Sequence, residues 1–259
     1  MADKFIWYEL MTTDLEPALG FYREVVGWSS ADHEGTTPGG DRYVILSAGG
    51  RAIGGAMQLS EGMLGGGARP GWFGYVGVAD TDVKAREVEA AGGKVLMGPG
   101  DIPTVGRFAF VTDAGGAPFY LLTPQPRPDA PPPPAAGDAG GVAWHELQSG
   151  AGEAAAFAFY SRLFGWETMA EMPMGPMGSY RIFGADGEQL GGMMDKPEAM
   201  PVSAWQFYFT VDGIDAAAGR VRANGGAVVR EPHQVPDGSW IIHGRDPQGA
   251  VFALNSTQR

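Results

Sequence analysis

Two short runs of the sequence place a carboxylate beside an indole. The run WYEL, which contains Trp7 and Glu9, recurs in the second half as WHEL, which contains Trp144 and Glu146. Each run is apolar enough to form a strand, and alternate side chains of a strand point to the same face. We therefore expect each tryptophan to share a face with the glutamate two residues later.

A carboxylate on a partly apolar wall is costly to bury unless it is hydrogen-bonded or meets a cation. One interpretation has Glu9 and Glu146 satisfied within the protein, by backbone amides, Tyr75, Tyr208 or Arg107. The other has them receive a donor or cationic group of a ligand, with tryptophan stacked on it. In this second case either glutamate could also act as a general base, so both are candidate catalytic residues.

Further side chains are expected to line the same two clefts. Methionines in MAEMPMGPMGSY and in LGGMMD suit a pocket for a flexible apolar molecule. Smaller Ala253 and polar Gln206 predict a roomier pocket in the second half. The candidate ligand-binding residues are Trp7, Phe73, Arg107 and Tyr120 in the first half, and Trp144, Met193, Gln206, Tyr208, Trp240 and His243 in the second.

The elements that must position these residues are repeated. FYREVVGW recurs as FYSRLFGW, IGGAMQ as LGGMMD, and DAGGAPFYLL as DPQGAVFALN, in the same order. Between the copies, a run of four prolines favours an extended spacer and cannot donate the hydrogen bonds of a sheet. The sequence therefore predicts a duplicated domain, with boundaries at 1–124 and 142–259 and a Pro/Gly-rich linker at 125–141.

Each half itself contains two similar units. The first reads as a strand at 4–12, a helix at 15–26 and three further strands. Asp14 is a plausible N-cap of this helix, and Gly27 is expected to end it. We predict an α+β protein of four βαβββ modules, two in each domain.

Four such modules, with Trp-x-Glu-Leu first strands and helices ending FY….GW, resemble the vicinal oxygen chelate superfamily. This superfamily contains glyoxalases, bleomycin-resistance proteins and extradiol dioxygenases. The pattern is most similar to two-domain glyoxalase-like proteins of actinobacteria, typified by a mycobacterial antigen. The resemblance implies curved mixed sheets, each enclosing a cleft that in catalytic members holds a divalent metal.

The positions that hold the metal in such relatives carry other residue types here. An indole has no lone pair for a cation, and only one of the six side chains, Gln206, could coordinate. We therefore predict no family-type metal site and no cofactor, since such metals require about three or more protein ligands. The residues at these positions are Trp7, Phe73, Tyr120, Trp144, Gln206 and Ala253.

Composition limits the partners. The net charge of −12 argues against nucleic acid and suits small neutral or cationic ligands. The chain has no cysteine, no apolar run long enough to span a membrane, and no signal-peptide pattern at its start, so we expect a cytoplasmic protein without disulfides or a membrane partner. It could be a monomer with intramolecular domain pairing or a homodimer.

These features favour a protein that binds a small organic molecule in a cleft without a family-type metal. An alternative is an enzyme, either a glyoxalase-like lyase, an isomerase or a dioxygenase- or hydroxylase-type member, that uses Glu9 or Glu146 as general base. A second alternative is a protein with vestigial clefts and a role in assembly.

Overall fold

The computed structural model describes residues 3–35 and 40–259, which contain sixteen strands and five α-helices. The α+β class and the order of the four modules are confirmed. The first half consists of β1 (Phe5–Thr12), α1 (Leu15–Val26), β2 (Ser29–Asp32), β3 (Tyr43–Ala48), β4 (Arg51–Gln58), α2 (Glu61–Gly65), β5 (Gly71–Gly77), α3 (Thr81–Ala90), β6 (Lys94–Ile102), β7 (Gly106–Thr112) and β8 (Pro118–Pro124).

The second half repeats this order without a counterpart of α2. It consists of β9 (Val142–Ser149), α4 (Glu153–Phe164), β10 (Glu167–Pro173), the 3₁₀-helix η1 (Gly175–Met177), β11 (Ser179–Ala185), β12 (Glu188–Asp195), β13 (Ala204–Thr210), α5 (Ile214–Ala223), β14 (Ala227–Gln234), β15 (Trp240–Arg245) and β16 (Val251–Ser256).

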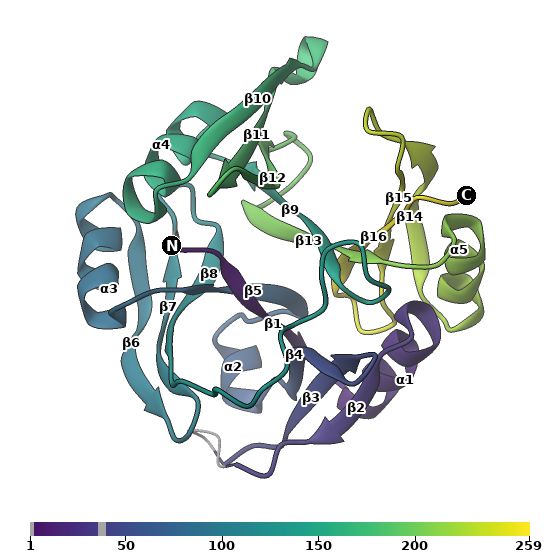
Figure 1. Cartoon of the computed structure of the whole chain (residues 1–259), viewed down its shortest axis with the longest axis horizontal. Coiled ribbons are helices and arrows are strands. Elements are labelled where there is room, and N and C mark those ends of the chain that lie inside the picture. Colours follow the sequence, from purple (N-terminus) through teal and green to yellow (C-terminus); the bar gives the residue numbers. More distant parts are fainter. Residues whose placement is uncertain (1–2, 36–39) are drawn as a thin grey trace. The chain divides into compact units, whose positions relative to one another are not determined.

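Each half forms one eight-stranded sheet (Figure 1). The strand orders are β2-β3-β4-β1-β5-β8-β7-β6 and β10-β11-β12-β9-β13-β16-β15-β14, so equivalent strands take equivalent places. The first strand of every module runs parallel to its last, as β9 does to β12, and the hairpins between are antiparallel. The sheets are therefore mixed.

The two longest helices end as their sequences predict. Gly27 follows α1 with a φ of 88°, and Gly165 follows α4 with a φ of 71°, the left-handed region in which glycine is unstrained. Asp14 stands at the N-cap of α1 in extended backbone, but its side chain makes no capping hydrogen bond. The N-cap of α3 is fully formed, since Asp80 accepts from the backbone N–H of Val83 at 2.9 Å.

The contacts of the chain divide it into two compact units, and each unit takes one module from each half. The first unit contains Phe73–Arg127 and Trp144–Gln206, with the N-terminal residues up to Trp7. The second contains Tyr8–Trp72, Pro128–Ala143 and Phe207–Arg259. Within each unit, close packing therefore joins modules of different halves.

A buried chain of hydrogen bonds joins the two modules of the first unit. The Trp205 indole donates to the Tyr160 hydroxyl at 2.9 Å, and this hydroxyl donates to Asp113 at 3.2 Å. Asp113 belongs to the β7–β8 turn of the first half, whereas Tyr160 lies on α4 of the second. Asp113 also accepts from the backbone N–H of Ala117 at 2.8 Å, which closes its own turn.

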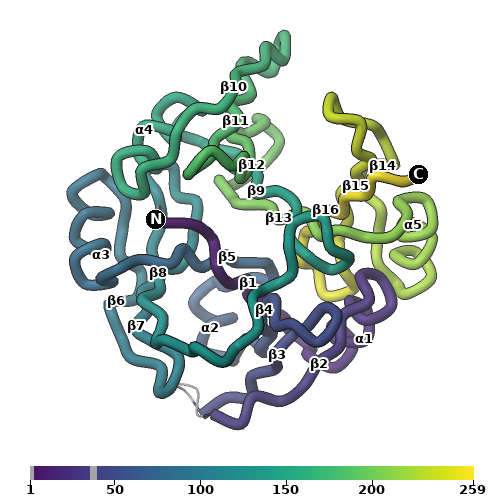
Figure 2. Tube along the Cα trace, in the orientation of Figure 1, coloured from purple at the N-terminus to yellow at the C-terminus, as the bar shows by residue number. Residues whose placement is uncertain are grey.

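The second unit contains the same arrangement with the halves exchanged. Trp72 donates to Tyr22 at 2.8 Å, and Tyr22 on α1 donates to Asp246 in the β15–β16 turn at 3.1 Å. Helices α1 and α5 lie side by side in this unit (Figure 2). The tyrosine of the repeated Phe-Tyr pair and the aspartate of the repeated last turn therefore form the same buried hydrogen bond in each unit.

The end of the proline-rich linker is bound to the second unit. The Trp28 indole donates to the carbonyl of Gly140 at 2.9 Å, and Thr210 donates to that of Ala136 at 2.6 Å. Arg51 forms an ion pair with Asp138. This stretch is therefore held by the second unit and is more than a spacer.

Candidate functional site

Strand β9 separates the predicted residues by alternation. Leu147 is completely buried, and His145 is stacked on Phe5 with ring centroids 4.8 Å apart. Trp144, Glu146 and Gln148 have the opposite parity and therefore point to the other face of the strand. His145 is thus a packed histidine on the same face as Leu147.

Glu146 is held by a network of hydrogen bonds in the first unit. Tyr180 donates to one carboxylate oxygen at 3.0 Å, and Gln148 donates to the other at 3.1 Å. The Tyr180 hydroxyl accepts from the Trp144 indole at 2.8 Å. Burial, reinforced by the charge of Glu146, raises the pKa of the Tyr180 hydroxyl well above its usual range, so it remains a donor.

Met194 completes this surface, which we call the Glu146 face: Trp144, Glu146, Gln148, Tyr180 and Met194. In the sheet register Met194 is opposite both Gln148 and Tyr180. Glu146 as a whole is 8% exposed, whereas Trp144, Gln148 and Met194 are half-buried. The face therefore presents a held carboxylate within a wall of aromatic and thioether groups.

Two glycines of β12 allow this geometry. A Cβ on Gly191 would lie 2.0 Å from the backbone oxygen of His145, so this glycine permits close strand pairing. A Cβ on Gly192 would lie 2.1 Å from the ring of Tyr180, which crosses this position to reach Glu146. Both glycines of the repeated Gly-Gly are thus required: Gly191 by the backbone of β9, and Gly192 by the ring of Tyr180.

Replacing Gly192 with alanine is expected to displace Tyr180 from Glu146 and to cost about 1–3 kcal/mol of unfolding free energy, as overpacking does. Urea unfolding checks this. In a Tyr180→Ala background the same change should cost almost nothing, because the obstructing ring is gone. Gly98→Ala is the control, since a Cβ there meets nothing within 4 Å. An equal cost in both backgrounds would contradict this account.

The first half has a related but less polar arrangement in the second unit. Glu9 is 4% exposed, and a Cβ on Gly55, its partner in the register, would lie 2.1 Å from the Tyr43 hydroxyl. Tyr43 thus crosses Gly55 as Tyr180 crosses Gly192. The position of Gln148 is taken by buried Met11, so the amide donor of the second half has no equivalent. Trp7 is half-buried on the same strand.

Phe73 and Tyr120, predicted to line the first cleft, belong to an aromatic cluster in the first unit. Tyr120 stacks on Tyr75 at 4.2 Å and on Phe110 at 4.4 Å between ring centroids. Phe73 meets Phe110 edge-on at 5.7 Å. Tyr75 and Tyr120 are buried, so their rings mainly fill this face.

Gln206 on β13 is the polar counterpart of Phe73. Its neighbour Trp205 bonds to Tyr160 on α4, so alternation directs Gln206 away from the α4 side. The Gln206 Nε2 atom is buried and has no hydrogen-bond partner among the residues that the structure describes. An unpaired buried amide is costly, and a ligand acceptor would satisfy it.

Tyr208 and His243, in the second unit, form a bonded pair. The Tyr208 hydroxyl and His243 Nε2 are 3.0 Å apart, and Ala253 lies between them in the strand register. Burial, aided by the charges of Arg230 and His233, lowers the pKa of His243 to about 4. The imidazole is therefore neutral near pH 7.

Three predicted ligand-binding residues lie on the opposite, helix-facing side of their strands. Met193 is completely buried and shares the register of Leu147. Its neighbour Met194 is the methionine on the Glu146 face. The prediction for Met193 is therefore wrong by one residue, since neighbouring residues of a strand point to opposite faces.

Arg107 and Trp240 occupy equivalent positions and are corrected for the same reason. Arg107 makes a two-bond ion pair with Asp82 on α3, at 2.5 and 3.0 Å, so it does not serve Glu9. Trp240 lies under Arg259, whose guanidinium is 4.9 Å from the ring and pairs with Asp215 on α5. Both side chains stabilise the helix layer.

The side chains at the metal positions of the resembled superfamily do not fit a metal. Trp144 donates its only N–H to Tyr180, Tyr120 is stacked between two rings, and Ala253 has no donor atom. In residues 3–35 and 40–259, no three His, Asp or Glu side chains are grouped to hold an ion.

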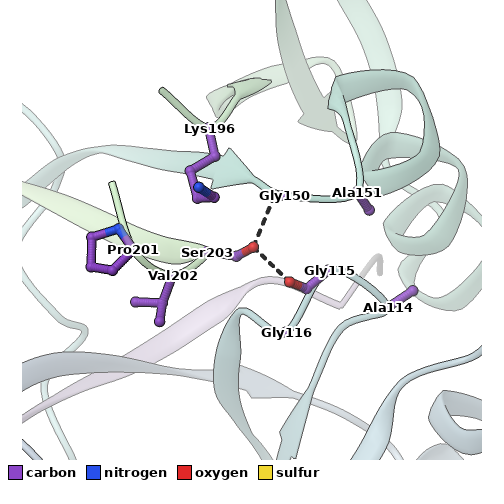
Figure 3. Close-up of a pocket in the computed structure, with 9 residues that line it drawn as sticks. All are labelled: Ala114, Gly115, Gly116, Gly150, Ala151, Lys196, Pro201, Val202 and Ser203. Atoms are coloured by element: carbon purple, nitrogen blue, oxygen red, sulfur yellow. Dashed lines mark hydrogen bonds between the residues drawn. The ribbon is translucent and has the colours of Figure 1, made fainter. Parts of the chain in front are cut away.

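A separate pocket of about 350 Å³ in the first unit contains none of the predicted residues (Figure 3). Ser203 accepts from the Gly150 N–H at 2.8 Å and donates to the Gly115 carbonyl at 2.6 Å. Lys196 already donates to the carbonyls of Pro197 and Met200. The polar side chains that line this pocket, Ser203 and Lys196, therefore bond to loops of the protein itself.

The sequence contained a signal for the tyrosine that the prediction missed. Tyr43 and Tyr180 both stand twelve residues before the second glycine of the Gly-Gly repeat, at Gly55 and Gly192. Equal spacing in both copies places each ring over the same glycine. Gln148 had no such signal, because the first half has methionine at its position.

The fold agrees with a comparison against known families. The chain belongs to the glyoxalase/bleomycin resistance protein/dioxygenase superfamily, whose model matches residues 4–121 and 153–254. It is 32% identical to CFP32 of Mycobacterium bovis, provisionally described as a glyoxylase, over 96% of this chain and 92% of that protein. It is 26% identical to the anthracycline biosynthesis protein DnrV of Streptomyces peucetius, over 96% of this chain and 91% of DnrV.

Among solved structures, the fold is similar to the Mn(II)-bound glyoxalase from Novosphingobium aromaticivorans. The TM-score is 0.68 at 14% identity, covering 100% of this chain and 83% of that one. This likeness concerns the fold. Among the described residues, no helix is long and apolar enough to cross a membrane.

Proposed function

We propose that the Glu146 face binds a small organic molecule without a family-type metal. The observation that carries the proposal is the buried carboxylate of Glu146, held by Tyr180 and Gln148 beside the half-buried Trp144. The ligand would offer a hydrogen-bond donor or a cation to Glu146, and an apolar or aromatic body to Trp144 and Met194.

The hydrogen-bond capacity of the face supports this assignment. An ionised carboxylate has about four acceptor positions, and the protein fills two of those of Glu146 through Tyr180 and Gln148. The unpaired Nε2 of Gln206 supplies a donor from the same unit. A ligand with both a donor and an acceptor would satisfy these groups, and the net charge of −12 favours a cationic one.

DnrV guides the choice of probe. Its name associates that relative with anthracycline biosynthesis, and an anthracycline is a flat aromatic molecule that carries an amino sugar. Such a compound combines the cation and the aromatic body that the Glu146 face suits. Its N-acetylated form keeps the aromatic body and removes the charge, so the pair tests Glu146 specifically.

Replacing Glu146 with glutamine is expected to weaken binding of the amine-bearing anthracycline about tenfold or more, because one charge-assisted hydrogen bond contributes about 1.5–3 kcal/mol. Isothermal titration calorimetry measures this. The N-acetylated compound should lose much less affinity. Glu198→Gln is the matched control, since Glu198 is exposed. If Glu146→Gln and Glu198→Gln bind the amine-bearing compound equally, the proposal is wrong.

The same samples separate the alternatives. Chemical change of the compound by the wild type, lost in Glu146→Gln or Glu9→Gln, would favour an enzyme with a glutamate base. No binding by the wild type, together with concentration-dependent association in sedimentation, would favour the assembly role. Binding without turnover favours the proposed function.

A further inference from the structure

A row of side chains crosses the last four strands of the second half. Arg230 on β14 is opposite His243 on β15, His243 is opposite Ala253 on β16, and Ala253 is opposite Tyr208 on β13. Opposed residues in a sheet point to the same face. We call these four residues the Arg230 row, and all of them belong to the second unit.

The equivalent row of the first half is apolar or aromatic. Met97, Phe110, Tyr120 and Tyr75 occupy the places of Arg230, His243, Ala253 and Tyr208. The difference extends one pair further along the strands, where His233 is opposite Ile241 and its first-half equivalent is Gly100. The two copies thus have the same backbone, but only the second carries an arginine and two histidines here.

These three side chains lie close together. The rings of His233 and His243 are 6.2 Å apart and edge-on. Arg230 is exposed, and no carboxylate in the described part of the chain forms an ion pair with it. The nearby Glu231 is used by Arg222, at 2.6 Å. In a chain with a net charge of −12, an exposed arginine without an ion pair among the described residues, beside two imidazoles, is unusual.

We propose that the Arg230 row binds an oxyanion group, a carboxylate or a phosphate, of a small molecule. Arg230 supplies the charge and a planar pair of N–H donors, which match an oxyanion. The hydrogen-bonded pair of Tyr208 and His243 supplies one further directional donor, and His233 borders the site. The site is independent of the Glu146 face, so the failure of either proposal leaves the other intact.

Protonation of His243 reports on such a site. Its burial and its neighbours Arg230 and His233 hold the pKa of the imidazole at about 4. A bound oxyanion would favour the charged form of the imidazole and raise this pKa. His243 should therefore take up a proton on anion binding near pH 5, whereas an unbound imidazole there stays neutral.

NMR titration of the histidine rings with inorganic phosphate and with benzoate tests the proposal on the full chain. We expect a saturable shift of the His243 signals with at least one anion in the millimolar range, and a higher His243 pKa in the bound form. Arg230→Gln should weaken binding about tenfold, the loss of one charge-assisted bond. Arg222→Gln, which removes an arginine of α5 that pairs with Glu231, should leave the affinity unchanged.

The first half supplies a second variant. Arg230→Met with His243→Phe installs the pair found at Met97 and Phe110, so it should fold and bind neither anion. If it does not fold, the surface variant Arg230→Gln still decides the outcome. Saturation by phosphate alone or by benzoate alone would identify the anion class. The proposal is overturned if neither anion produces a saturable shift, or if Arg230→Gln and Arg222→Gln bind equally.

Discussion

Replacing Asp113 with alanine is expected to lower the free energy of unfolding by about 3 kcal/mol, because it breaks a buried hydrogen-bond network. The change leaves the Tyr160 hydroxyl without its acceptor and the N–H of Ala117 without its partner in the turn. Both groups are buried, so water cannot replace the carboxylate. Chemical denaturation of the purified protein measures the loss.

Two controls make this result specific. Asp129→Ala, in the exposed part of the linker, should cost less than about 0.5 kcal/mol. Asp113→Ala combined with Tyr160→Phe should cost less than the sum of the single changes, since the two residues share one contact. Asp246→Ala should reproduce the effect through Tyr22. A loss at Asp113 no larger than at Asp129 would refute the structural role of the contact.

Lowering the pH from about 6.5 to about 4 is expected to remove about 3 kcal/mol of stability through His145 alone. Burial lowers the pKa of His145 from 6.5 to about 4. In this window the unfolded chain binds a proton at His145 and the folded protein does not. Stability therefore falls as the pH falls, and the loss is complete once the pH is below about 4.

The variant His145→Asn isolates this contribution. Asparagine can keep a donor towards the Leu190 carbonyl, which His145 Nδ1 contacts at 2.6 Å, but it does not titrate. Its unfolding free energy should depend less steeply on pH, with the remaining slope from His243 opposed near pH 4 by Asp113 and Asp246, whose pKa values are raised by burial. Phe5→Leu removes the ring stack and should lower stability equally at each pH. Equal slopes in His145→Asn and wild type would contradict the assignment.

The module order could be predicted from the sequence because the repeats preserve it. Helix α1 was predicted at its observed bounds, since Gly27 provides a clear end. The common face of Trp144 and Glu146 followed from their spacing of two. The predictions for Arg107 and Trp240 failed because neighbouring residues of a strand point to opposite faces. Arg107 lies three residues before Phe110, and Trp240 lies three residues before His243. Each therefore points to the face opposite to that of Phe110 or His243.

The pairing of modules across the halves could not be predicted from the sequence. Tyr22 and Tyr160 are in identical sequence contexts, as are their aspartate acceptors, so the residues alone do not say which tyrosine meets which aspartate. The partner depends on how four similar modules pack. The Tyr180–Glu146 bond depended on the register of three strands, which local patterns do not specify.

This exchange has a consequence for the chain during its synthesis and evolution. When the first half leaves the ribosome, Asp246 and Tyr160, which bond to Tyr22 and Asp113, have not yet been synthesised. A half expressed alone would expose both Tyr22 and Asp113, and because they are complementary in kind, two copies could satisfy each other. Fusing two such halves through the linker replaces an association that depends on protein concentration by one that is intramolecular. Fusion also allows each copy to diverge. The two copies do differ at the Arg230 row, whose equivalent in the first half is apolar or aromatic.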